Sequence, residues 1–441
     1  MLDIKFIREN ADSIKQSCKN KKVGVDIDRL LNIDKDRKEL KQKLEKISAE
    51  KNKASKEISL AKDDNEKRKE IIAGMQSLDK EADELKEKLE NVEKEFNALM
   101  IEVPNVCCPD VPFGEDEQGN KVIKKWGTPP KFDFKPKDHM ELGEALGIID
   151  TKKASEITGA RFGYLKGAAA LLEYALLQYV FSILTSEKTL KKIAQSVEKG
   201  YSAKPFVPAV PPVMIRPDIF KKMARLSEQD KDERYYLPQD DLYLIGSAEH
   251  TLGPLHMNEI IDEKDLPIRY VGFSTSFRRE AGSYGKDTKG ILRVHQFDKI
   301  EMESFTLPEN SVKEQNFFVA IQEYLVQSLK IPYQVVMICS GDMGRPDARQ
   351  IDIECWMPGQ NKYRETHTSD LMTDYQARRL NIRTRRKNGK TEFVHMNDAT
   401  AFAIGRILIA ILENYQQKDG SVEVPKVLQK GLGLKKIKKN G

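Results

Sequence analysis

Two long segments near the start of the chain carry mostly apolar residues at alternating spacings of three and four, with Arg37 and Lys51 at two positions of the first. The first repeat runs from Leu30 to Ile58 and the second from Ile71 to Leu99. This spacing keeps one apolar stripe along a helix, and two such helices joined by a short turn pack as an antiparallel coiled coil. At roughly 1.5 Å per residue, each helix extends for about 45 Å. The pattern predicts a two-helix arm, preceded by a short helix that begins near Asp3.

A stretch rich in proline and glycine follows the second repeat. Because proline breaks a helical pattern and favours extended or turn geometry, the arm is expected to occupy residues 1–103 and a linker residues 104–138. The remainder, 139–441, is then the main domain.

The main domain mixes helical and strand patterns. A nearly all-apolar run at 163–185 contains Lys166, Glu173 and Gln178, so it predicts a helix buried in a core or a subunit interface rather than a membrane span. Further patterns predict strands at 333–338, 350–356 and 393–396, and a closing helix at 401–415. Because there is no regular strand–helix–strand alternation, we expect an α+β fold with an antiparallel sheet.

The segment 277–303, FRREAGSYGKDTKGILRVHQFDKIEME, predicts two strands joined by a long loop. Arg278 and Arg293 are suited to bidentate contacts with phosphate oxygens, and Glu280 and Glu301 can accept hydrogen bonds from amino or hydroxyl groups. The residues alone favour a second interpretation, a charged hairpin that faces water.

Composition narrows the class of protein. Charged residues make up 32% of the 441 positions and the net charge is only +5, so a nucleic-acid surface would require local clustering of basic residues. The five scattered cysteines argue against a zinc site and for a reducing compartment. The first ten residues mix charged and apolar side chains and do not form a signal peptide. We therefore expect a cytoplasmic protein without a membrane segment.

Basic residues cluster on the arm, but acids alternate with them, so an ordinary ion-paired surface competes with an RNA-binding surface. The basic set is Lys41, Lys43, Lys46, Lys51, Lys53 and Lys56, with Lys62, Lys67 and Arg68 at the tip.

Three segments together resemble the class II aminoacyl-tRNA synthetases. Residues 277–303 resemble the second signature motif of that class, and their amino-acid sequence is similar to that of the seryl-tRNA synthetases. The helix and proline-rich strand that end near residue 215 resemble the first signature, which forms the dimer interface in that family. The run NDATAFAIGRILIAILENYQ resembles the third signature. The resemblance covers essentially the whole chain and implies the class II antiparallel sheet with flanking helices, preceded by the coiled-coil arm.

The resemblance implies a ligase that activates serine with ATP and Mg²⁺ to seryl-adenylate and transfers the seryl group to the 3′ end of tRNA(Ser), with tRNA(Sec) as a second candidate acceptor. It also implies a homodimer. An amino acid:carrier-protein ligase could reuse the same catalytic domain, although the long arm counts against it. A non-enzymatic coiled-coil or regulatory protein is a further alternative. Such a protein would tolerate losses in the signature motifs, but both arginines and Glu280 are present.

The same resemblance implies roles for individual residues. The catalytic group is Arg278, Arg406 and Glu365. Contacts to ATP are expected from Arg278, Arg279, Glu280, Val294, Phe297, Glu365, Thr366, His367, Thr368 and Arg406. Serine is expected to contact Ser247, Ala248, Glu249, Glu301 and Thr400. Magnesium is expected at Glu365, with Asp352 or Glu354 as a carboxylate partner.

Two short stretches depart from the family pattern. Thr366, His367 and Thr368 stand where an Ile or Val and two serines are usual, and Asp370-Leu371 replaces a common Ser-Asn. Glu301 carries the sharpest hypothesis on specificity: a buried carboxylate that accepts the hydroxyl proton of serine would be left unpaired by alanine, at a high energetic cost.

Overall fold

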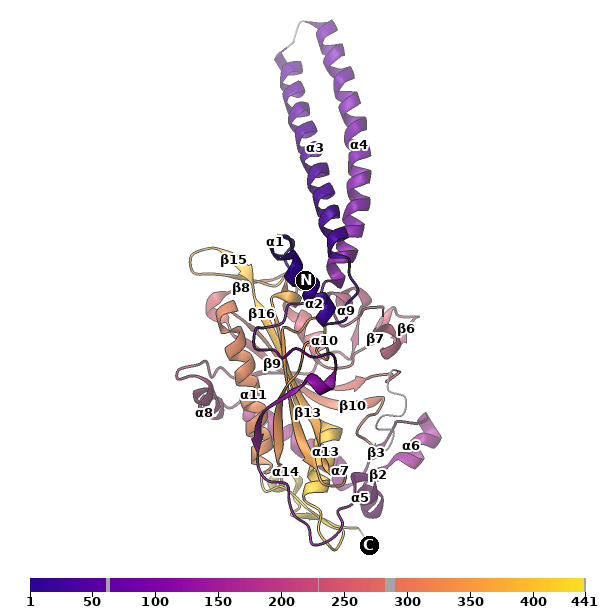
Figure 1. Cartoon of the computed structure of the whole chain (residues 1–441), viewed down its shortest axis with the longest axis vertical. Helices are drawn as coiled ribbons and strands as arrows, with labels where there is room; N and C mark the ends of the chain where they lie inside the picture. Colours follow the sequence, from indigo (N-terminus) through magenta and orange to yellow (C-terminus); the bar gives the residue numbers. More distant parts are fainter. Residues whose placement is uncertain (61–63, 229, 282–289, 440–441) are drawn as a thin grey trace. The chain divides into compact units, whose positions relative to one another are not determined.

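A computed structural model describes residues 1–60, 64–228, 230–281 and 290–439 of the chain (Figure 1). The chain divides into two compact units, Met1–Pro104 and Asn105–Gly441.

The first unit is helical. Helix α1 (Ile4–Glu9) begins after Asp3, whose side chain accepts the Lys5 N–H at 2.8 Å, and α2 (Ala11–Asn20) follows. The long helices are α3 (Ile27–Leu60) and α4 (Asn65–Glu102). With 34 and 38 residues, they extend for about 51 and 57 Å.

Helices α3 and α4 run side by side in opposite directions (Figure 1). The ion pairs that join them show the direction, because position rises in one helix as it falls in the other: Arg29–Glu95, Lys41–Glu93 and Lys51–Asp79. An apolar seam of Leu40, Leu44, Ile47, Leu78, Ala82 and Leu85 lies between the helices. The predicted coiled-coil arm is confirmed. Of the expected basic tip, Lys62 and the side chain of Lys67 lie outside the described residues.

The second unit is built on an eight-stranded sheet with the order β1-β11-β12-β13-β16-β10-β9-β4. Neighbouring strands are antiparallel except for β4 and β9, which are parallel. The strands are β1 (Lys121–Trp126), β4 (Val207–Ala209), β9 (Ile268–Phe277), β10 (Gln296–Thr306), β11 (Tyr333–Met337), β12 (Arg349–Met357), β13 (Lys362–Thr373) and β16 (His395–Ala403). The predicted antiparallel α+β fold is confirmed.

Helix α11 (Ser311–Ser328) lies against the centre of this sheet and is bonded to it. Gln315, one turn into the helix, donates to the backbone carbonyls of Arg349 and Ser369, each at 2.9 Å. Gln322, seven residues later on the same face, donates to the carbonyls of Thr368 and Thr400 at 2.7 and 2.8 Å. These bonds fix the strands from which the site residues project.

Shorter elements surround the sheet. The remaining helices are α5 (His139–Leu146), α6 (Thr151–Thr158), α7 (Ala168–Leu184), α8 (Glu187–Val197), α9 (Pro217–Lys222), α10 (Glu249–Leu252), α12 (Tyr375–Leu380), α13 (Ile404–Asn414) and α14 (Gln429–Leu432). The remaining strands are β2 (Ile149–Asp150), β3 (Tyr164–Leu165), β5 (Met214–Ile215), β6 (Tyr236–Leu237), β7 (Leu242–Leu244), β8 (Ile260–Asp262), β14 (Arg383–Arg385), β15 (Thr391–Phe393), β17 (Val422–Glu423) and β18 (Lys436–Ile437).

Four boundaries differ from the sequence prediction. The strand expected at 393–396 is divided between β15, which ends at Phe393, and β16, which begins at His395. The stretch 104–138 contains β1, which pairs with β11, so this part of the expected linker belongs to the sheet. The apolar helix begins at Ala168 rather than 163, because residues 164–165 form β3 against β2. The closing helix begins at Ile404, because residues 401–403 complete β16.

Candidate active site

The β9–β10 segment predicted from the sequence forms one wall of a cleft of about 310 Å³. The cleft is lined by Arg225, Arg278, Glu280, Ile291, Leu292, Arg293, Val294, Phe297, Lys299, Gly344, Asp347, Gln350, Glu365, Thr366, Thr368, Asp370, Thr400, Ala403, Gly405 and Arg406. Segments that are far apart in sequence therefore converge on one cavity.

The interpretation of the segment as a solvated hairpin is wrong. Strand β10 is paired on both edges, with β9 and β16, and Glu301 and Glu303 have no exposed surface. Arg278 follows β9 and is anchored by its own N–H, which donates to the His295 carbonyl at 2.9 Å. The loop glycines Gly282 and Gly285 lie outside the described residues.

Arg278 and Phe297 form the next part of the wall. The Arg278 guanidinium lies 5.3 Å from the centre of the Phe297 ring, and its Nε donates to the Gly246 carbonyl at 3.2 Å. Glu280 contacts Arg293 across the loop and has a positive φ of 53°. A flat aromatic ring beside a guanidinium suits a purine base that carries phosphates.

Arg406 lies in the first turn of α13 and reaches across to β13. Its Nη1 donates to the Glu365 Oε1 at 2.7 Å and to the Glu365 carbonyl at 3.1 Å. Desolvation in the cleft opposes ionisation of Glu365, but the charges of Arg406, Arg278 and Lys299 hold its pKa below the ordinary value. The two arginines thus share one electrostatic environment although they come from separate elements.

Glu365 belongs to a group of three carboxylates on β12 and β13. Glu354 on β12 lies opposite Glu365 on β13. Asp352, two residues before Glu354 and beyond a β-bulge, lies opposite Thr368. All three line a second cavity of about 670 Å³ together with Arg406. Burial, and then the charge of Glu365, raises the pKa of Asp352 well above its ordinary value. Carboxylate oxygens are the ligands that a hard dication such as Mg²⁺ prefers, so these residues offer suitable ligand types, although their ligand atoms do not all lie within 4.8 Å of one another.

A second group of polar side chains surrounds Glu301 inside the sheet. The Ser247 hydroxyl donates to Glu301 Oε2 at 3.0 Å, the Lys299 ammonium lies 2.5 Å from the same oxygen, and the Thr400 hydroxyl donates to Oε1 at 3.5 Å. A β-bulge brings Thr400 opposite Glu301, because Ala401 is an extra residue on β16. Burial raises the pKa of Glu301, and Lys299 opposes this shift.

Glu249 lies close to this group but lines a neighbouring cavity of about 320 Å³ that shares Arg225, Arg278 and Lys299 with the cleft. Ligand oxygens of Glu249, Glu301 and Asp398 lie within 4.8 Å of one another, and all three residues are buried. This end of the cleft therefore concentrates negative charge and fits a small cationic group.

Several expected site residues do not reach the cleft with their side chains. His367 is buried and packs on Phe402 with 5.5 Å between ring centres, and burial lowers its pKa to about 3. Arg279 lies over Tyr235 at 5.7 Å. Ala248 is buried where it precedes α10. Thr366 lines the cleft, but its hydroxyl is directed to the Ile353 carbonyl at 3.1 Å.

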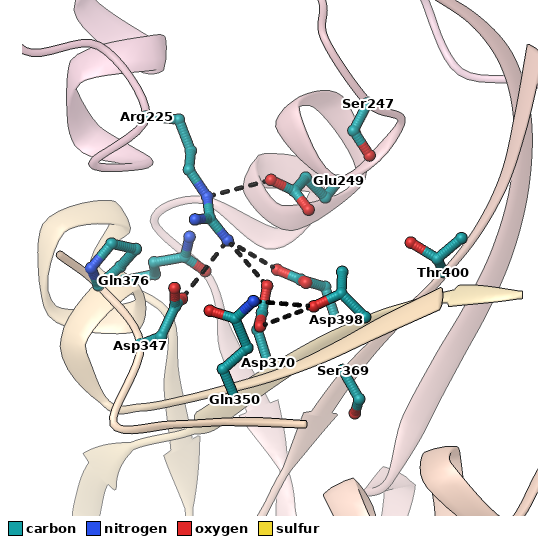
Figure 2. Close-up of polar contacts among 12 residues, drawn as sticks. Arg225, Ser247, Glu249, Asp347, Gln350, Ser369, Asp370, Gln376, Asp398 and Thr400 are labelled. Carbon is teal, nitrogen blue, oxygen red and sulfur yellow. Dashed lines mark hydrogen bonds and ion pairs between the residues drawn. The ribbon is translucent and has the colours of Figure 1, made fainter. Parts of the chain in front are cut away.

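Sequence reasoning missed Arg225 and two of the acids around it, Asp347 and Asp398, whereas Glu249 was an expected serine contact (Figure 2). Arg225 follows α9, and Ala224 before it has a φ of 58°, a left-handed conformation that ends the helix and turns the chain. Its partners are Glu249, Asp347, Asp370 and Asp398. A loop arginine has no periodicity to mark it, although Asp370 was visible as a departure from the family pattern.

No single helix in the described ranges is long and apolar enough to cross a membrane. Helices α7 and α8 pass such a test only as a pair, and they are bent by 71° at their junction. None of the five cysteines forms a disulfide.

Comparisons with known proteins cover both units. Residues 1–107 match the seryl-tRNA synthetase N-terminal domain, and residues 233–415 match the tRNA synthetase class II core domain (G, H, P, S and T). The serine–tRNA ligase of Dictyoglomus thermophilum is 42% identical over 441 residues, which is 99% of each chain. That of Nitrosopumilus maritimus is 38% identical over 437 residues, 99% of this chain and 100% of the relative.

Two solved structures are similar over the full length. The seryl-tRNA synthetase of Pyrococcus horikoshii, complexed with ATP, is 37% identical with a TM-score of 0.89 and is covered completely, as is this chain. The cytoplasmic serine–tRNA ligase of Naegleria fowleri, in complex with AMP, is 31% identical with a TM-score of 0.85, over 100% of this chain and 99% of that one.

Proposed function

The chain belongs to the seryl-tRNA synthetase family and is a serine–tRNA ligase, and we propose that its cleft performs the reaction through the residues described above. ATP is a substrate of this reaction. The observation that carries the proposal is the convergence of Arg278, Phe297 and Arg406 on one cavity with Lys299 and Thr400, which both contact buried Glu301 behind the cavity wall.

The first step joins serine to the nucleotide. A carboxylate oxygen of serine attacks the α-phosphorus of ATP, a bond forms between them, and the bond to the β-phosphate oxygen breaks to release pyrophosphate. Because Arg278 lies beside Phe297, a base stacked on that ring places its α-phosphate near the guanidinium. Arg278 then offsets the negative charge that develops at the phosphorus, and this is the main contribution a protein makes to such a step.

Arg406 is proposed to hold the γ-phosphate at the other end of the triphosphate. Glu365, with Asp352 and Glu354, would hold Mg²⁺, which would offset the negative charge of the triphosphate. The 2.7 Å contact between Arg406 and Glu365 keeps both groups in place at this end of the cleft.

Serine recognition is proposed at the anionic end. Glu301 accepts the hydroxyl proton, assisted by the neighbouring hydroxyls of Ser247 and Thr400, and Glu249 receives the α-ammonium. Ala248 belongs to this end of the site, whereas Thr366, His367 and Thr368 are proposed to contact ATP. In the second step, a hydroxyl of the terminal ribose of tRNA attacks the seryl carbonyl, and AMP leaves.

The arm is proposed to bind tRNA(Ser), and tRNA(Sec) remains a candidate acceptor. A homodimer is proposed through α7, because Leu171 and Tyr174 on this otherwise apolar helix are 51% and 65% exposed. A cytoplasmic location stays a prediction from the five cysteines, none of which forms a disulfide.

Serine-dependent exchange of pyrophosphate into ATP tests the assignment of Arg278. We expect Arg278→Ala to lower the exchange rate by about 100-fold or more, because an oriented charge is lost at the reacting phosphate. An exchange rate equal to that of the wild type would refute the role.

A further inference from the structure

The guanidinium of Arg225 lies among four carboxylates from separate parts of the fold (Figure 2). It is 3.0 Å from Glu249 on α10, 3.4 Å from Asp398 on β16, 3.5 Å from Asp347 before β12 and 3.6 Å from Asp370 on β13. Its side chain is only 15% exposed. Removal of one partner from such a buried group would leave uncompensated charge. The contacts with the shared guanidinium hold each carboxylate in a defined position.

Glu249 is held through one of its two oxygens. The Gly246 N–H donates to His250 Nδ1 at 3.1 Å, so the proton of the neutral imidazole is assigned to Nε2. That Nε2 lies 3.3 Å from Glu249 Oε1, and Arg225 Nε lies 3.0 Å from the same oxygen, in an ion pair rather than a hydrogen bond. Both contacts are made to Oε1, which leaves Oε2 as the oxygen to receive a ligand.

The acids around Glu249 make a cation necessary. Glu301 and Asp398 lie close to it, and Glu303 is fully buried on β10, with no hydrogen-bond partner for either oxygen in the described part of the chain. Burial, followed by the charges of Glu249 and Glu301, raises the pKa of Glu303 well above its ordinary value. Without the positive charge of Arg225, repulsion from the neighbouring acids would raise the pKa of Glu249 in the same way.

We propose that Arg225 is a positioning residue for serine recognition: through Glu249 Oε1 it fixes an ionised carboxylate whose Oε2 receives the α-ammonium of the substrate. The inference rests on the proposed role of Glu249. Arg225 itself does not contact serine in this arrangement, so its removal acts through Glu249.

The test is serine-dependent pyrophosphate exchange with the full chain, in which KM for serine and KM for ATP are measured separately. We expect Arg225→Gln to raise KM for serine by about 10- to 100-fold, because a carboxylate that is misplaced or neutral no longer orients the ammonium, and to leave KM for ATP within about threefold. Arg225→Lys keeps the charge but not the planar fork, so it should recover part of the loss.

The pH profile of kcat/KM for serine gives a readout that a merely structural role would not change. Loss of the positive charge raises the pKa of Glu249, so the acid limb of the profile should move to higher pH in Arg225→Gln. The groups that face Glu249 from its surroundings are Arg225, Arg234, His250, Lys299, Glu301, Glu303, Asp370 and Asp398.

Two further variants separate the outcomes. Arg269→Gln removes another buried arginine, bound to Glu314 at 2.6 and 2.8 Å outside the cleft, and should lower stability without a change in KM for serine or in the pH profile. Glu249→Gln tests the proposed function itself and should raise KM for serine strongly. If Glu249→Gln does so but Arg225→Gln leaves KM and the pH profile unchanged, the inference about Arg225 is overturned while the role of Glu249 stands.

If Glu249→Gln also has no effect, the role of Glu249 and the inference fail together. Should Arg225→Gln not fold, Arg225→Lys is measured alone: an increase of about tenfold in KM for serine supports the inference, and wild-type values of KM and pH profile overturn it.

Discussion

The ammonium of Lys299 lies 2.5 Å from the carboxylate of Glu301, two positions along the same strand. Residues two apart in a strand project from the same face, so β10 itself supplies both charges. Burial raises the pKa of this carboxyl group, and the contact with Lys299 opposes that shift by favouring the ionised form. Glu301 is thereby prepared to accept a hydrogen bond from a substrate hydroxyl.

Replacement of Glu301 should therefore damage serine activation selectively. We expect Glu301→Ala to lower serine-dependent pyrophosphate exchange by about 10- to 150-fold, the value of a hydrogen bond to a charged group. ATP binding, measured by equilibrium titration, should change little, because Glu301 lies at the amino-acid end. Unchanged exchange would show that another group recognises the hydroxyl.

Shortening the arm should separate the two half-reactions. Deletion of residues 30–99, bridged by a short flexible linker, removes most of α3 and α4 but leaves the second unit intact. We expect exchange within a few-fold of the wild type and no charging of tRNA(Ser), measured as acid-precipitable labelled serine. Charging that survived the deletion would make the arm a purely structural element.

The carboxylates on β12 and β13 should determine the Mg²⁺ concentration that the exchange reaction requires. Asp352→Asn removes one hard ligand, so the Mg²⁺ concentration that gives half-maximal exchange should rise by about tenfold or more. A titration of exchange against Mg²⁺ at fixed ATP measures this shift. Glu198→Gln, which alters an exposed carboxylate paired with Lys313, is the control, and superimposable curves for Asp352→Asn and this control would exclude Asp352 from the metal site.

Buried His367 should make folding stability depend on pH. Burial lowers its pKa from 6.5 to about 3, so between these values the unfolded chain binds the additional proton. Its contribution to stability is therefore complete above about pH 6.5 and is lost as pH falls toward 3, at up to about 1.4 kcal/mol per pH unit. Urea unfolding of His367→Asn between pH 6.5 and 4 should give a correspondingly shallower dependence than the wild type. Equal slopes would contradict this assignment.

Features that depend on local residue spacing could be predicted from the sequence, whereas features that depend on contacts between distant segments could not. The arm was predictable because the spacing from Leu30 to Leu99 is a local property of two helices. The charges of residues 277–303 were visible, but their burial was not, because it comes from β16, whose residues lie about a hundred positions away. Lys299 and Arg225 could not be identified, since each gains its role only when separate elements place acids around it.

One measurement tests the central claim most directly: full-length protein is incubated with labelled serine, ATP, Mg²⁺ and total tRNA, in parallel with labelled alanine. We expect acid-precipitable label on tRNA with serine, dependent on ATP, and none above background with alanine, because Glu301 would be left without its partner. Absence of label with serine, or equal charging with alanine, would contradict a cleft built to join serine to tRNA.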